Sequence, residues 1–138
     1  MTENDRDQLL IYIDTDIDKL QKIIDLLQGL KHPEDCPGRL SEYNRCLHID
    51  IHTMEDLHRA RAFLRYEFGT WEDKLTTIFA SYNAYAVWEG RARDVEIRIY
   101  LSCPVAEFPE ELHRTKGCSF KKVSRSQLSY VCEKEETE

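Results

Sequence analysis

The chain is 138 residues long, with 41% apolar and 33% charged residues and a formal net charge of −7. These values indicate one folded domain spanning residues 1–138 and disfavour a disordered or membrane-embedded chain. The negative charge also disfavours nucleic acid as the main partner, because Lys and Arg supply most of the affinity for phosphate backbones.

The strongest pattern in the chain predicts an N-terminal segment, residues 7–30, with an amphipathic helix from Asp7 to Gly29. Its apolar residues recur at alternating spacings of three and four, as the a and d positions of a heptad do: Leu10, Ile13, Ile17, Leu20, Ile24 and Leu27. At the g positions, Leu9, Ile23 and Leu30 widen this apolar stripe. The helix therefore either covers its own sheet or joins copies of the chain, and both hold if one edge packs inward and the other outward.

After a proline-containing loop at residues 32–38, the main body of the domain is expected at residues 44–132. Alternating apolar and polar residues predict a half-buried strand from Leu47 to His52. Thr53 then has the position of an N-cap for a helix that ends at Gly69.

The remaining pattern predicts strands. We expect strands at 75–82, 85–89 and 95–101, joined by turns at Asn83-Ala84 and Gly90, as an antiparallel meander. After these strands we expect a short helix at residues 110–114 and a hairpin formed by residues 118–123 and 128–132. A charged tail at residues 133–138 ends the chain. The predicted fold class is therefore α+β: an N-terminal amphipathic helix, then β-α, a meander and a C-terminal hairpin.

The polar side of the strand at 47–52 carries metal-ligand residue types, His48, Asp50 and His52. A strand rises about 3.3 Å per residue, so the two histidines are too far apart for a compact tetrahedral site. Asp50 with one histidine is the preferred pair. Three interpretations of these residues are open. They line the solvent face of a sheet, they form a hydrolase-type divalent-metal centre, or they form a polar binding surface.

Basic residues gather in the predicted hairpin and could bind an anion: Arg114, Lys116, Lys121, Lys122 and Arg125. The alternative is a solvated face that balances the acidic N-terminal helix. Other arginines, Arg91 and Arg93 among them, would converge on an anion only if the fold brings them together.

Five cysteines without a C-x-x-C pair favour free thiols in a reducing compartment over a disulfide framework or a zinc ribbon. The acidic N-terminus lacks the bases of a secretory signal, so we expect a cytoplasmic protein without membrane contact. Cys46 and His48 share one strand face and are the only nearby nucleophile and base. The sequence contains no P-loop, G-x-G-x-x-G, H-E-x-x-H or G-x-S-x-G motif.

These features favour a small acidic accessory protein without a cofactor, which acts by binding rather than by catalysis, as a homo-oligomer and on another protein. A phage-encoded inhibitor of a nucleic-acid-processing protein fits this description, because carboxylates can replace phosphates opposite Lys and Arg. One alternative is a metal-dependent hydrolase or nuclease in which His48, Asp50 and His52 hold a divalent ion that activates water. The other alternative is a binder of a small anionic ligand.

Overall fold

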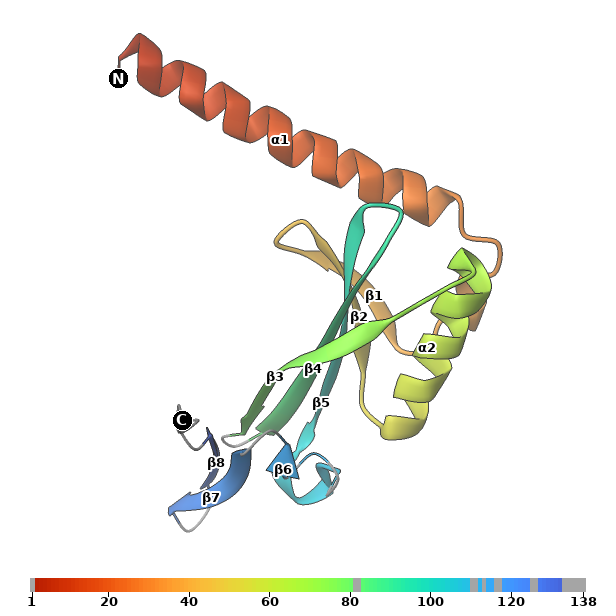
Figure 1. Cartoon of the computed structure of the whole chain (residues 1–138), viewed down its shortest axis with the longest axis vertical. Coiled ribbons are helices and arrows are strands. Elements are labelled where there is room, and N and C mark those ends of the chain that lie inside the picture. The colour runs from red at the N-terminus through yellow and green to blue at the C-terminus, as the bar shows by residue number, and fades with distance from the viewer. Residues whose placement is uncertain are drawn as a thin grey trace, which may run out of the picture.

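Five strands form one mixed sheet in the order β1-β2-β5-β4-β3, with α2 on one side of it and α1 extending from one end (Figure 1). The computed structural model describes residues 2–80, 83–109, 112, 114–115, 118–124 and 127–132, with residues 80 and 105 and those beyond 112 described by their backbone only. The elements follow one another as α1 (Glu3–Gln28), η1 (Pro33–Asp35), β1 (Arg39–Tyr43), β2 (Cys46–Ile51), α2 (Met54–Phe68), β3 (Asp73–Ala80), β4 (Asn83–Ala92), β5 (Val95–Pro104), η2 (Val105–Glu107), β6 (Arg114–Thr115), β7 (Cys118–Ser124) and β8 (Gln127–Cys132). The α+β prediction, with the helix first and the meander after β-α, is confirmed.

Helix α1 begins at Glu3, before the predicted start at Asp7. Thr2 and Asp5 form a capping box: the Asp5 amide donates to Thr2 Oγ1, and the Thr2 amide donates to the Asp5 carboxylate, both at 3.1 Å. Such a cap satisfies two amides of the first turn and adds residues to the helix before the apolar pattern starts. None of the helices in the described part of the chain is long and apolar enough to cross a membrane.

The core lies between α2 and the apolar side of the sheet. In β5 the residues alternate strictly, with Val95, Ile97, Ile99 and Leu101 buried, and β2 shows the same alternation. Strand β2 pairs with β5 in parallel, while β3, β4 and β5 form the predicted antiparallel meander. The parallel pair arises because α2 carries the chain from β2 across to β3 at the far edge of the sheet.

Three features of the sheet differ from the predictions, and the first is the turn predicted at Asn83-Ala84: both residues belong to β4, because they pair with Pro104 and Cys103 of β5. Strand β1 was not predicted, because a short edge strand without a buried residue has no strong alternation. Strand β4 runs on through Gly90, and the turn lies at Arg93-Asp94. A Cβ atom at Gly90 would come within 2.5 Å of the Trp71 ring, so this glycine makes room for an aromatic side chain instead of forming a turn.

Helix α2 begins and ends as predicted. Thr53 Oγ1 accepts the amide of Asp56 at 3.1 Å, and Gly69 follows the last residue with φ of 84°. Near its end, the buried Glu67 carboxylate accepts the backbone amides of Lys31 and His32 at 2.8 and 2.7 Å. Because these two residues follow α1 directly, Glu67 fixes the point where α1 leaves the body.

The C-terminal part contains the predicted hairpin, with β7 and β8 paired antiparallel. Arg114 belongs to β6 and pairs with β7, so it is not helical as predicted. A two-residue strand is recruited by its neighbour and has no periodicity of its own that the sequence could reveal. Residues 110, 111 and 113 of the predicted short helix, and the tail at 133–138, lie outside the described residues.

Candidate functional site

The N-terminal half of α1 projects from the body (Figure 1). Every residue from 2 to 15 is exposed, whereas Ile23 and Leu26 in the second half are only 4% and 3% exposed. The helix is therefore anchored at its C-terminal end, and its first turns extend beyond the described body of the protein.

The predicted a and d residues of α1, named the α1 seam, stay largely exposed. Leu20 alone packs partly against the core. The exposed fractions of the other five are 51% for Leu10, 41% for Ile13, 57% for Ile17, 45% for Ile24 and 37% for Leu27. A contiguous apolar surface of this kind is typical of a protein contact.

The wide stripe of α1 is divided between two directions. Successive residues of a helix are about 100° apart, so Ile23 at a g position and Ile24 at an a position point to different neighbours. The g edge packs inward through Ile23 and, in part, Leu30, while the a edge at Ile17 and Ile24 is exposed. Packing on its own sheet accounts for only one edge of the stripe.

Two hairpin turns of the sheet meet α1. The β1–β2 turn holds Asn44 and Arg45 at φ of 55° and 62°, and the β4–β5 turn holds Arg93 and Asp94 at 49° and 64°. Two consecutive positive φ values form a type I′ turn, a conformation that usually selects glycine. Arg45 uses this position to reach α1, where its guanidinium donates to Asp16 at 2.7 Å. This ion pair joins α1 to the sheet.

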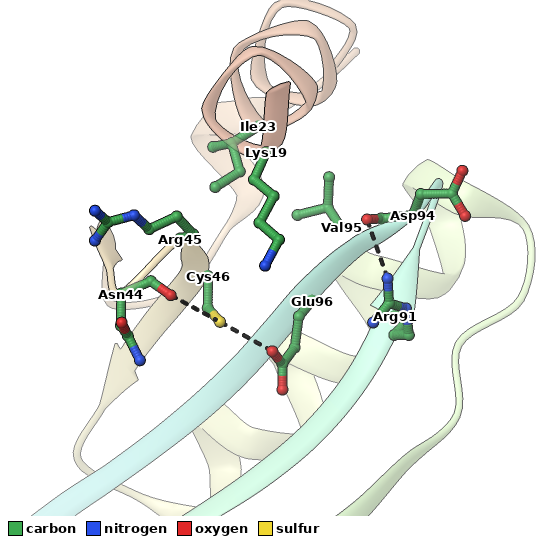
Figure 2. A pocket seen from close by; sticks show the side chains of 9 residues that line it. All are labelled: Lys19, Ile23, Asn44, Arg45, Cys46, Arg91, Asp94, Val95 and Glu96. Atoms are coloured by element: carbon green, nitrogen blue, oxygen red, sulfur yellow. Dashed lines mark hydrogen bonds between the residues drawn. The ribbon is translucent and has the colours of Figure 1, made fainter. Parts of the chain in front are cut away.

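A polar crevice, named the α1 crevice, lies between α1 and these two turns (Figure 2). It has a volume of about 120 Å³. Three cations from three elements line it: Lys19 of α1, Arg45 of the β1–β2 turn and Arg91 of β4. Its other lining residues are Ile23, Asn44, Cys46, Asp94, Val95 and Glu96.

The chemistry at the base of the crevice is set by Cys46 and Glu96. The Cys46 thiol donates to the Glu96 carboxylate at 3.0 Å, and Arg98 donates to the same carboxylate at 3.4 Å. Both contacts lower the pKa of Glu96, while burial and the adjacent carboxylate raise the pKa of Cys46 to about 11. The thiol therefore stays protonated at neutral pH, which disfavours the nucleophilic role considered for Cys46 with His48.

The predicted metal residues lie along the polar side of the sheet. His48 and Asp50 belong to β2, and Asp50 accepts a hydrogen bond from Ser41 at 3.3 Å. His52 follows β2 and contacts the Ser102 carbonyl through Nδ1 at 2.9 Å. Among the described residues, these three do not bring their ligand atoms within 4.8 Å of one another. Metal binding by them stays a prediction.

A different set of ligand-type atoms does meet. His32, Glu34 and Asp35 in and beside η1 place theirs within 4.8 Å, with His32 Nδ1 3.3 Å from Glu34. Both acidic residues are exposed. Exposed acidic turns of this kind are common on protein surfaces, so we assign this group no role.

The predicted basic hairpin lies outside the residues whose side chains are described: Arg114, Lys116, Lys121, Lys122 and Arg125. Anion binding there stays a prediction. The crevice cations form a set that the sequence did not reveal, since Lys19 and Arg91 are 72 positions apart. The one local signal was the Asn44-Arg45 pair, because Asn in such a position is typical of a hairpin turn.

No family model, no curated protein and no solved structure matches this chain. The functional proposals therefore rest on its own residues.

Proposed function

We propose that this protein acts by binding and that the α1 seam joins two copies in a parallel coiled coil. The exposed seam on the projecting half of α1 carries the proposal. This half includes Ile11, Tyr12, Ile13 and Thr15, whose side chains are branched at Cβ or aromatic and favour helices only weakly. A helix of such residues is stabilised mainly by packing on a partner.

A second copy of the chain is the partner that the pattern favours. A stripe with heptad spacing packs against an identical stripe, because each a or d side chain fits between four residues of the facing helix. In the second half of the seam Ile17 and Ile24 stand at a, with Leu20 and Leu27 at d, whereas the first heptad has Leu10 at a and Ile13 at d. In parallel coils this combination of isoleucine at a and leucine at d favours two strands.

The residues beside the seam are compatible with a parallel pair in register. In that arrangement a g residue of one helix lies near the e residue five positions later in the other. The resulting pairs at g positions that face away from the core are Leu9 with Asp14 and Asp16 with Gln21, whereas Ile23 is buried against the sheet. Neither pair places two like charges together.

We further infer that the joined helices bind another, larger protein with a basic surface. The exposed carboxylates of Asp7, Asp14 and Asp18 lie on the projecting helix, where they would attract Lys and Arg of such a partner. A nucleic-acid-processing protein has a surface of this kind in its phosphate-binding groove. Inhibition of such a protein is the activity that we propose.

The mass of the protein in solution tests the self-association. We expect sedimentation equilibrium of the wild type to give twice the 16.3 kDa mass of one chain. Ile17→Glu, alone or with Ile24→Glu, puts carboxylates opposite each other in the seam and is expected to give the mass of a monomer. Circular dichroism should show that the body of the variant stays folded, since 57% of the Ile17 side chain is exposed.

The matched control is Ile11→Glu, the same substitution on the same helix. Ile11 is 60% exposed but stands at a b position outside the seam. This variant should keep the mass of the wild type. A wild-type monomer at micromolar concentration, or equal loss of association in both variants, would contradict the proposed seam.

A further inference from the structure

We propose that the α1 crevice binds a small tetrahedral oxyanion, either free phosphate or the phosphate group of a monoester. Lys19, Arg45 and Arg91 line one small crevice from three separate elements, and Figure 2 shows the Lys19 ammonium reaching down into it. In a molecule with a net charge of −7, a lining with three cations and two carboxylates, Asp94 and Glu96, is locally positive. Arg and Lys are the residues that proteins use to bind phosphate.

These cations have donors left for a ligand. Among the described residues, no carboxylate lies within 4.0 Å of the Lys19 ammonium. Arg91 donates to the Asp94 carbonyl at 3.3 Å, and Arg45 pairs with Asp16 through one terminal nitrogen only. The Nε atom of Arg45 is buried and has no hydrogen-bond partner in the described part of the chain. A buried donor without an acceptor is costly, and an oxyanion could supply the acceptor.

The acidic residues of the crevice leave its cations available. Glu96 accepts hydrogen bonds from Arg98, which also pairs with Glu89 at 3.3 Å, and from the Cys46 thiol, and Figure 2 shows the Asp94 carboxylate turned away from the other lining side chains. Asp16 neutralises one of the three cations. Lys19 therefore provides a positive charge without an ion-pair partner among the described residues, and Arg91 adds a second cation whose field lowers the pKa of the neighbouring Glu96.

The size of the crevice selects the ligand. A volume of about 120 Å³ is well below the roughly 300–1,000 Å³ of pockets that enclose drug-sized molecules. A phosphate group is small enough, whereas the sugar and base of a nucleotide would remain outside. Donors from more than one element also suit the separate oxygens of a tetrahedral anion.

Binding at this position would connect α1 to the body. Lys19 belongs to the helix, while Arg45 and Arg91 belong to the two hairpins below it. An anion shared by these side chains would therefore stabilise the folded protein in proportion to its concentration. Lys19 stands at a c position outside the seam, so this site does not depend on self-association.

Titration of the full chain with inorganic phosphate tests the site, with sodium chloride at matched ionic strength as the reference. We expect phosphate to raise the thermal midpoint beyond the chloride reference and to give a saturable heat in calorimetry. Lys19→Gln and Arg91→Gln are each expected to weaken phosphate binding about tenfold or more, since each removes a charged hydrogen bond. Adenosine monophosphate is expected to bind with similar affinity through its phosphate group.

The matched control is Lys22→Gln on the same helix. Lys22 does not line the crevice and pairs with Asp18 at 3.5 Å, so its loss should leave phosphate binding unchanged. The proposal is overturned if phosphate does no more than chloride, or if Lys19→Gln binds phosphate as the wild type does. Binding of the nucleotide without binding of phosphate would also contradict it. Each variant's mass in solution shows whether a loss comes from the seam instead.

Discussion

At the scale of single residues, His48 shows how the sheet changes the chemistry of a side chain. It lies on the polar side of β2, where Cα pairing places it beside Arg98 of β5. Burial and the Arg98 charge both disfavour the imidazolium and lower the pKa of His48 below its ordinary value of 6.5. The neutral ring has a nitrogen that could bind a metal ion. In this structure the ring is a partly buried side chain of β2.

The lowered pKa of His48 predicts a loss of stability in acid. Below pH 6.5 the unfolded chain takes up a proton at His48 more readily than the folded chain does, so the free energy of unfolding falls as the pH falls. His48→Gln should flatten this part of the curve, measured by urea unfolding from about pH 8 to about pH 5. An unchanged slope in His48→Gln would contradict the assignment.

At the scale of elements, α1 combines two kinds of helix. Its second half is an ordinary amphipathic helix that buries Ile23 and Leu26 in the core. Its first half exposes the seam over a length of helix in which every residue from 2 to 15 is exposed. The two halves share one continuous hydrogen-bonded backbone, so the anchored half holds the exposed half in a defined direction.

Disulfide formation tests the parallel register that we propose for α1. In a parallel pair, residue 10 of one helix faces residue 10 of the other, so Leu10→Cys should give a covalent dimer under mild oxidation, seen on a non-reducing gel. Ile11→Cys provides the control, because its side chain points away from the seam. The native Cys36, Cys46 and Cys103 are partly or fully buried, and the wild type oxidised in parallel measures the background from all five native cysteines. A dimeric mass without cross-linking at residue 10 would exclude the parallel register.

At the scale of the whole molecule, self-association and folding are connected through α1. The seam continues into the half of the helix that carries part of the core. Leu20 shows this, because it belongs to the seam and also packs partly against the core. Partner binding at the seam therefore stabilises the body as well as the projecting half, by mass action.

This connection predicts that the thermal midpoint depends on protein concentration. We expect the wild type to gain roughly 2–4 °C for each tenfold increase in concentration, because each such step favours the folded dimer by about 1.4 kcal/mol. Circular dichroism follows α1, and the fluorescence of the buried Trp71 and Trp88 follows the body. Ile17→Glu should show a midpoint that does not change with concentration. Concentration-independent midpoints in the wild type would count against the dimer.

The sequence by itself determined the local parts of this protein: the seam of α1, the alternation in β2 and β5, the Thr53 cap and the C-terminal hairpin. These follow from periodicities and caps that span only a few residues. The tertiary structure alone decided which edge of the α1 stripe is covered, that β2 and β5 run parallel, and that Lys19, Arg45 and Arg91 meet in one crevice. Such arrangements depend on contacts between distant parts of the chain, which leave no periodic signal in the sequence.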